Sequence, residues 1–275
     1  MNFSGRGFPL TQDGLDAAAS AADIGVAELW ALVSVETSGC GFLADRRPKI
    51  LFERHIFSRL TDGQFDADDP DISQPSQGGY GSPGAHQYDR LCVALTLNAE
   101  AALQSASWGL GQIMGENFKD AGFASIDDMV AAMIAREDNQ LRAIVAFLNA
   151  TGMDGSLRDH NWTSFARRYN GPNFAASNYD GLLSHFYEIY STGVLPSVGT
   201  RAIQIELTYR GFPVGTADGV MGDRTTNAIK AFQAANHLPV TGMVDAALLG
   251  ELEPPPDGHP KSPTCGHFKF LHLTR

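Results

Sequence analysis

The chain has 275 residues, of which 43% are hydrophobic, and a formal net charge of −11 at pH 7. This length predicts one large or two unequal domains, and the hydrophobic share suits a packed core and is too high for a disordered chain. Proteins that bind nucleic acid usually present a basic patch or stripe. Because the chain is acidic and its basic residues are scattered, we expect no nucleic-acid partner.

The N-terminus and the metal-ligating residue types exclude further classes. The first residues, MNFSGRGFPL, lack a basic segment followed by an apolar run, so we expect no signal peptide. No stretch approaches the ~18 apolar residues that a membrane-spanning helix needs, so we expect no integral membrane segment. The three cysteines and eight histidines show no metal-ligand spacing, and we expect neither a metal nor another cofactor.

Hydrophobic periodicity predicts a mainly helical region over residues 11–190. Val26, Leu29 and Val33 follow the spacing of one apolar helix face. The same spacing, with cap residues at some of the ends, predicts helices over residues 23–36, 88–103, 126–149, 161–169 and 179–190. Residues 49–57, with their apolar ILF run, are the one candidate strand. We therefore expect a mainly α fold with a small β element.

Turn-forming residues divide the rest of the chain. Residues 61–87 are rich in Asp, Gly, Pro, Ser and Gln, and a loop of this length is either functional, here as the wall of a substrate groove, or disordered. We expect a first domain over residues 1–191 and a linker over residues 192–199. A compact unit follows over residues 200–252, and a proline-rich tail over residues 253–275.

Glu36 is the carboxylate best placed for acid catalysis. It follows Leu29 by seven residues, which is two helical turns, so it shares the apolar face and lies near the helix end. Burial and the negative end of the helix dipole both disfavour a charged carboxylate and raise its pKa. A pKa near neutral suits a general acid that protonates a leaving oxygen. The alternative is a carboxylate that only caps the surface end of the helix.

Three short segments occur in one order along the chain: SVETSG at residues 34–39, SWGLGQIM at 107–114 and YNGP at 169–172. Together they resemble the motifs of the goose-type lysozyme and lytic transglycosylase superfamily. With RPKILFERH at residues 47–55, the stretch 20–190 resembles more closely the N-acetylmuramidase family found in phage endolysins. The resemblance implies a lysozyme-like α+β catalytic domain.

The resemblance also implies roles for single residues. Glu36 is then the general acid, and Tyr169 and Asn170 support it and the substrate. Four residues of the second segment are expected to line the sugar cleft: Trp108, Gly109, Gln112 and Ile113. The glycines of that segment permit close approach of the backbone, here to a sugar, and an indole offers a flat face for stacking on a pyranose. The alternative for Trp108 is an aromatic residue of the core.

Glycoside hydrolases usually need a second carboxylate, as nucleophile or as the base that activates water. Asp45 and Glu53 are the candidates that follow Glu36, and we favour Glu53 because a strand facing the helix end could hold it across a cleft. The alternative is an ion pair of Glu53 with Arg54 or His55. Without a second carboxylate, Glu36 acts as acid and then as base, with the 6-hydroxyl of the substrate as nucleophile, as in lytic transglycosylases.

Three further segments mark the C-terminal unit: DGVMGDRTT at residues 218–226, AIKAFQ at 228–233 and LPVTG at 238–242. They resemble the peptidoglycan-binding type 1 module, a small three-helix domain, over residues 200–252. The resemblance implies wall contacts near the Asp-Gly turn from Asp218, Gly219 and Arg224, and the alternative is that these residues only form the turn. A linked module raises the local concentration of scissile bonds, so we expect it to act as a tether.

Together the resemblances imply a phage or prophage endolysin. It is expected to hydrolyse the β-1,4 bond between N-acetylmuramic acid and N-acetylglucosamine in bacterial peptidoglycan and so to cause lysis. The alternatives are a lytic transglycosylase acting on the same bond and a non-catalytic wall-binding or virion protein. We expect a monomer that stays in the host cytoplasm until a holin releases it to the periplasm and the cell wall.

Overall fold

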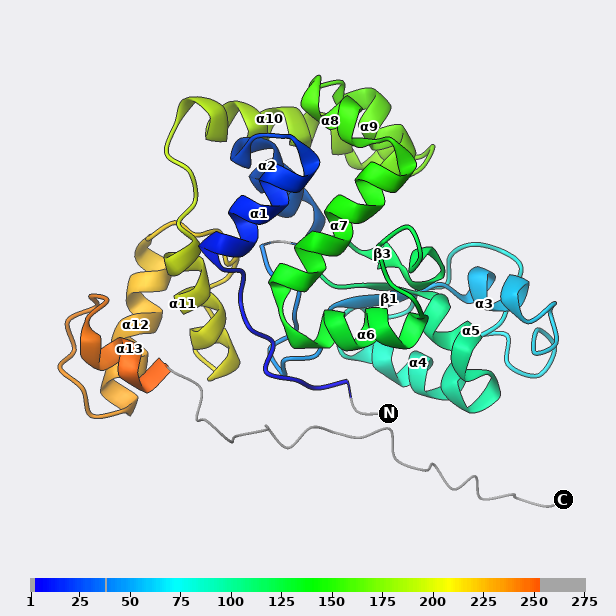
Figure 1. The fold of residues 1–275 in the computed structure, drawn as a ribbon. Helices are drawn as coiled ribbons and strands as arrows, with labels where there is room; N and C mark the ends of the chain where they lie inside the picture. Colours follow the sequence, from blue (N-terminus) through cyan, green and yellow to red (C-terminus); the bar gives the residue numbers. More distant parts are fainter. Residues whose placement is uncertain (1–2, 38, 253–275) are drawn as a thin grey trace, which may run out of the picture.

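The computed structural model describes residues 3–37 and 39–252, which form a large, mainly helical domain and a small helical domain beside it (Figure 1). The proline-rich tail expected at residues 253–275 lies outside the described residues. Within the described ranges no single helix is long and apolar enough to span a membrane, although α1 and α2 pass that test together as a pair bent by 107°.

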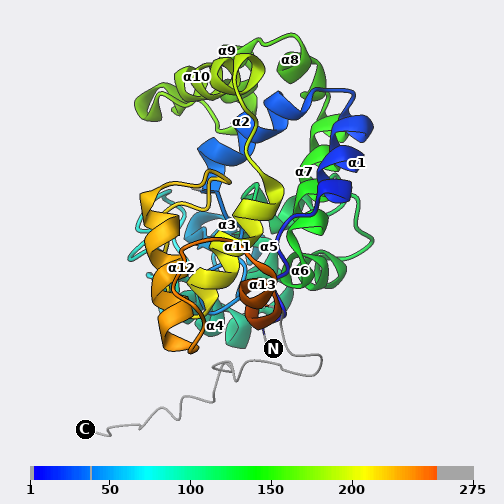
Figure 2. The same cartoon turned by 90° about the vertical axis from the view of Figure 1, so that its left-hand side faces the viewer.

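Helix α2 lies in the upper part of the large domain as drawn in Figure 1, where it packs along α10 and against α1 (Figures 1 and 2). The expected apolar face is confirmed, because Leu29 and Val33 are at most 2% exposed. The α-helices of the large domain are α1 (Gln12–Ala22), α2 (Val26–Thr37), α3 (Arg54–Leu60), α4 (His86–Leu97), α5 (Ala99–Gln104), α6 (Ile126–Ala135), α7 (Glu137–Thr151), α8 (Asp154–Arg158), α9 (Trp162–Tyr169) and α10 (Tyr179–Thr192). Two 3₁₀ turns, Gly115–Asn117 and Phe174–Ser177, accompany them.

The helix expected over residues 88–103 is two helices, α4 and α5, which meet at Asn98. The backbone of Asn98 is extended there (φ −153°, ψ 107°), and its side chain caps α5 by accepting a hydrogen bond from the N–H of Ala101 at 3.0 Å. Periodicity alone misses such a break, because the two halves still turn their apolar faces to one core.

The helix expected over residues 126–149 is likewise divided, into α6 and α7. The break falls at Arg136, whose extended backbone (φ −167°, ψ 156°) forms a bridge with Phe8 of the N-terminal segment. The N–H of Glu137 donates to the carbonyl oxygen of Phe8 at 2.9 Å. The break therefore makes Glu137 the first residue of α7 and anchors the N-terminal segment beside it.

A small antiparallel sheet contains β1 (Ile50–Phe52), β2 (Ala106–Trp108) and β3 (Ile113–Met114) in that spatial order. Leu51 pairs with Ser107 across β1 and β2. The strand expected over residues 49–57 is thus correct for its apolar run, whereas the chain turns into α3 directly after Glu53.

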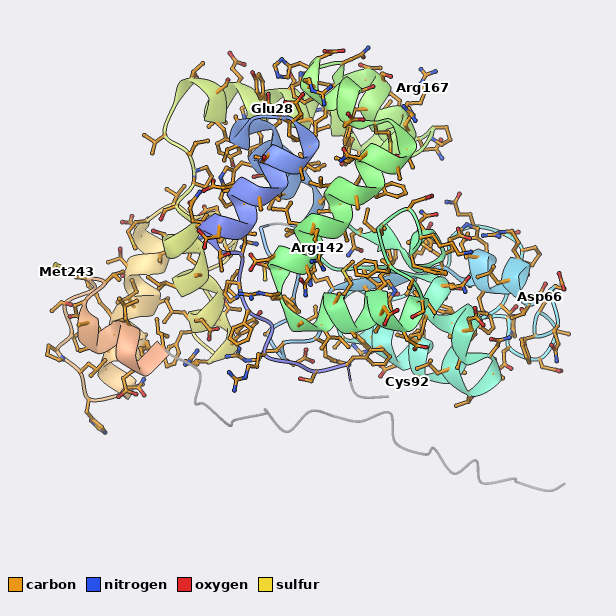
Figure 3. The ribbon with its side chains drawn as sticks, viewed as in Figure 1. Glu28, Asp66, Cys92, Arg142, Arg167 and Met243 are labelled. Atoms are coloured by element: carbon orange, nitrogen blue, oxygen red, sulfur yellow. The ribbon has the colours of Figure 1, made fainter. Side chains whose placement is uncertain are left out.

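The loop over residues 61–87 is held in place by side chains. Asp66, labelled in Figure 3, accepts hydrogen bonds from the hydroxyls of Ser58 at 3.0 Å and Ser73 at 2.5 Å. Arg90 of α4 donates to two carbonyl oxygens of the loop, at 2.6 and 3.0 Å. Of the two alternatives for this loop, the structure therefore shows an ordered segment.

The small domain consists of α11 (Val198–Tyr209), α12 (Asp223–Ala235) and α13 (Ala246–Leu252), in agreement with the expected three-helix module. Gln204 of α11 and Gln233 of α12 use their side-chain amides in the same way. Each oxygen accepts a hydrogen bond from a glycine N–H of the loop that follows its helix, from Gly219 at 2.9 Å and from Gly242 at 2.8 Å. Both glycines have positive φ, 75° and 72°, which favours glycine.

The small domain is docked on the large one through α11. Arg201 of α11 and Glu137 of α7 form an ion pair whose two side chains are 0% exposed. The connection between the domains comprises the few residues between Thr192, where α10 ends, and Val198, where α11 begins. The range expected for the linker, residues 192–199, includes the last residue of α10 and the first residues of α11.

Candidate active site

Glu36 is the penultimate residue of α2, and its environment matches that of a general acid. Burial raises the pKa of its carboxyl group from 4.5 to about 7, against the lowering effect of a hydrogen bond from Tyr179. The Tyr179 hydroxyl donates this hydrogen bond to Oε1 of Glu36. A carboxyl group with this pKa is protonated in a large fraction of molecules near neutral pH and can donate its proton.

Tyr179 is a candidate site residue that sequence reasoning missed. It is the first residue of α10, it is 5% exposed, and the packing of α10 along α2 brings its hydroxyl to Glu36. Burial and the neighbouring Glu36 raise the pKa of Tyr179 well above 10, so it remains a hydrogen-bond donor. The sequence carries no local signal for this role, because Tyr187 and Tyr190 occupy the same predicted helix.

Tyr169, expected to support Glu36, lies near it but bonds elsewhere. Burial, and then the charge of Glu36, raise the pKa of Tyr169 well above 10. Its hydroxyl donates to the carbonyl oxygen of Gly111 at 2.8 Å, and its ring stacks on Phe165 with the ring centroids 5.2 Å apart. Tyr169 therefore connects the second motif segment to the helix that ends with the third.

The structure corrects the role expected for Trp108. Its side chain is 1% exposed, its indole N–H donates to the carbonyl oxygen of Leu103 at 3.1 Å, and its ring lies against Phe3. Protein covers the faces of the ring, so the alternative of a core aromatic describes Trp108. Ile113 pairs with Trp108 across β2 and β3 and is itself 3% exposed, which makes it a core residue too.

Gly109 and Gly111 of the same segment allow protein side chains to pack closely against the backbone, at the place where a sugar was expected to bind. Gly109 has a φ of +68°, and a Cβ there would collide with the side chain of Gln140. A Cβ at Gly111 would collide with Ile144. The side-chain nitrogen of Gln112 donates to the carbonyl oxygen of Gly109 at 2.8 Å. In this structure the two glycines of the segment pack against side chains of α7.

Glu53 follows β1 and precedes α3, with a side chain that is 14% exposed. Its Oε2 lies 3.2 Å from Nδ1 of His55, which is the ion pair foreseen as the alternative role. Burial raises the pKa of Glu53, while His55, a hydrogen bond from Tyr80, and Arg90 lower it. Asp45, the other candidate, is held in an ion pair with Arg47 at 2.6 Å.

A cavity of about 390 Å³ lies between the long loop and the third motif segment. Its lining residues are Gln77, Gly78, Tyr80, Asn170 and Asn173. Tyr80 forms a hydrogen bond with Glu53. Asn170 directly follows Tyr169, whose pKa is raised in part by the charge of Glu36. The loop thus walls a polar cavity, and the amides of this lining suit the hydroxyl and acetamido groups of an amino sugar.

The small domain has a cavity of its own, of about 250 Å³, and Asp218 and Arg224 help to line it. Asp218 also accepts hydrogen bonds from the side chain of Gln204 at 3.0 Å and from the N–H of Val220 at 2.9 Å. Asp218 and Gly219 thus take part in the turn, and Asp218 and Arg224 are both exposed at the cavity. Among the described residues no group of three or more His, Cys, Asp or Glu side chains is placed to hold a metal ion.

Comparison with known proteins assigns a family to each of the two domains. The N-acetylmuramidase family matches residues 25–191, and the peptidoglycan binding domain family matches residues 197–252. The crystal structure of the Burkholderia AP3 phage endolysin is similar at 38% sequence identity and a TM-score of 0.63, over 67% of this chain and 71% of that chain. No curated protein matches the chain. The chain therefore belongs to the N-acetylmuramidase family: it is a glycoside hydrolase that acts on peptidoglycan and carries a C-terminal peptidoglycan-binding domain.

Proposed function

We propose that the protein is an endolysin that hydrolyses the β-1,4 bond between N-acetylmuramic acid and N-acetylglucosamine, with Glu36 as its general acid. The observation that carries the proposal is the pKa of about 7 at Glu36, raised by burial, beside a tyrosine that donates to its carboxyl group. Because Tyr179 donates to Oε1, the acidic proton resides on Oε2, from which it passes to the leaving glycosidic oxygen. The carboxylate that results keeps the hydrogen bond from Tyr179.

The second carboxylate is Glu53, whose hydrogen-bond partner Tyr80 lines the cavity of about 390 Å³. Two features support this role. Tyr80, which lines the cavity, donates a hydrogen bond to Glu53, and His55 pairs with it at 3.2 Å, so the carboxylate is oriented from two sides. Glu53 then either attacks the sugar or activates a water molecule, the two options open to paired carboxylates. Asn170 and Asn173, which line the cavity, bind the sugar.

The exposed Arg224 at the cavity of the small domain binds the cell wall. A wall pull-down tests this role, with Arg224→Ala expected to release the protein into the supernatant. We also propose that the enzyme is a monomer that reaches the wall from the host cytoplasm through a holin, a proposal supported by its similarity to a phage endolysin. Expression in bacteria with and without a holin tests the route: lysis without the holin would contradict it.

Substitution of the proposed acid tests the catalytic assignment. Glu36→Gln keeps the shape and the hydrogen bond to Tyr179 but cannot donate an acidic proton, so wall lysis should be lost while the circular dichroism spectrum is unchanged. Glu188→Gln is the matched control, because Glu188 is exposed on α10, the helix that carries Tyr179. Near-normal turnover by Glu36→Gln would contradict the assignment.

A further inference from the structure

The contact between the two domains centres on a buried ion pair. Nη1 and Nη2 of Arg201, from α11 of the small domain, donate to Oε2 and Oε1 of Glu137 at 2.6 and 2.8 Å. Both side chains are 0% exposed. Glu137 begins α7 of the catalytic domain, so a two-pronged charged contact joins the domains.

Glu137 also holds the chain that follows the catalytic helix. Its Oε1 accepts a hydrogen bond from the N–H of Gly41 at 2.8 Å, and its Oε2 accepts one from the N–H of Leu10 at 2.8 Å. Gly41 lies five residues after Glu36. One carboxylate therefore binds Arg201 of the small domain and, at the same time, the backbone that leaves the active-site helix.

The small domain touches this backbone a second time. Gly39 has a φ of +86°, and a Cβ there would collide with the carbonyl oxygen of Ala217 and contact the methyl group of Thr216. Thr216 also lines the cavity of about 250 Å³ in the small domain. Residues 39–41 are thus clamped between Glu137 on one side and the loop of the small domain on the other.

Other contacts fix the orientation of the small domain. Arg46 of the catalytic domain bonds to Glu206 of α11 at 3.0 Å, and its guanidinium lies 4.1 Å from the ring centroid of Tyr209. The Tyr209 hydroxyl donates to the carbonyl oxygen of Gly7 at 2.9 Å. A module that only tethers an enzyme needs none of these contacts.

We propose that the wall-binding domain supports the catalytic acid, and that Arg201 is a positioning residue which, through Glu137, holds residues 39–41 and thereby the end of the helix that carries Glu36. This inference rests on the proposed role of Glu36 as general acid. It assigns the small domain a role in turnover that is separate from its affinity for the wall. The role applies to every substrate, including short soluble glycan strands that need no tether.

The test compares Arg201→Lys with Arg46→Lys in the full chain, using solubilised, peptide-free glycan strands as substrate. Lysine keeps the charge but cannot form the two-pronged contact. Arg201→Lys should lower kcat about tenfold or more and leave KM within about twofold, since small displacements of a catalytic group cost that much. Arg46→Lys disturbs the same domain contact without touching Glu137, and it should leave kcat unchanged.

The pH profile separates positioning from a loss of folded protein. If residues 39–41 loosen, water reaches Glu36, its pKa falls from about 7 toward its ordinary value, and the alkaline limb of the kcat profile moves to lower pH. A loss of folded protein scales the whole profile without moving it. If Arg201→Lys has the kcat of the wild type and its alkaline limb does not move, the proposal is overturned. If the wild-type protein itself cleaves no glycan, the proposed function is overturned instead.

Hydrogen exchange of the wild-type chain tests the same coupling if Arg201→Lys fails to fold. The Gly41 amide should exchange with the same protection as the amides of α11, because the Arg201–Glu137 pair must open for either to be released. Rapid exchange at Gly41 while α11 stays protected would overturn the proposal.

Discussion

The hydroxyl of Tyr179 donates a hydrogen bond to the carboxyl group of Glu36, across the packed faces of α10 and α2. Two opposing influences therefore set the acidity of Glu36. Burial raises its pKa and the hydrogen bond lowers it, and the balance lies at about 7. Activity that needs the protonated acid is expected to decline as the pH rises through this value.

Tyr179→Phe should move that decline to higher pH. The substitution removes the hydrogen bond that lowers the pKa of Glu36 and leaves the burial that raises it, so the acid stays protonated to a higher pH. The carboxyl group also loses its orientation, and kcat at pH 6 should fall about tenfold. A kcat–pH profile measured on solubilised glycan strands checks both effects. Tyr190→Phe is the control on the same helix, and a limb that moves to lower pH in Tyr179→Phe would contradict the prediction.

Glu36→Gln should stabilise the protein at high pH and not at low pH. The folded pKa of about 7 exceeds the ordinary value of 4.5, so the folded state holds a proton that the unfolded state releases between these values. The contribution of this group to stability is therefore fully present below pH 4.5 and is lost as the pH rises through about 7. At pH 8 the variant should exceed the wild type by about 1–3 kcal/mol in urea unfolding, and at pH 4 the difference should vanish. Equal differences at both pH values would contradict this.

Removal of residues 196–275 should impair the enzyme on every substrate. The truncated chain loses Arg201, the partner of Glu137 in an ion pair that is 0% exposed in the full chain. Glu137 loses its two-pronged partner and the catalytic domain loses the contacts with α11, so thermal unfolding should shift to lower temperature. Activity should fall on intact walls and on solubilised strands alike, in contrast to the pure tether expected from the sequence. Arg224→Ala is the matched comparison, because it should reduce activity on intact walls only.

Trp108→Phe should destabilise the protein without altering substrate binding. The indole fills a core site at 1% exposure and donates to a backbone carbonyl, so the smaller ring leaves a void and an unpaired acceptor. A loss of about 2–3 kcal/mol is expected, with KM within the error of the wild type. Asn170→Ala, at the cavity, should do the opposite by raising KM at constant thermal stability. A raised KM in a Trp108→Phe variant of normal stability would restore the sugar-stacking role.

The features of the fold that follow from local periodicity were predictable from the sequence. The apolar spacing of Leu29 and Val33 locates α2 and places Glu36 at its end, and the ILF run locates β1. Breaks at Asn98 and Arg136 were not predictable, because they depend on a side-chain cap and on pairing with Phe8, which lies far away in the sequence.

The candidate site, too, could be predicted only where it depends on local sequence. The burial and the raised pKa of Glu36 could be predicted because both follow from its position on one helix. Trp108 was misassigned because a motif identifies a residue without stating which way its side chain points, and the β2 register turns this indole into the core. The contacts of Tyr179 with Glu36 and of Arg201 with Glu137 were not predicted, because each joins residues more than 60 positions apart in the sequence.

Mass spectrometry of the products from purified peptidoglycan, before and after borohydride reduction, tests the central claim most directly. Hydrolysis by Glu36 with Glu53 predicts glycan ends of N-acetylmuramic acid that borohydride reduces. Anhydro-muropeptides, which are lighter by one water and do not react with borohydride, would contradict it, because they would show that Glu36 works without a second carboxylate.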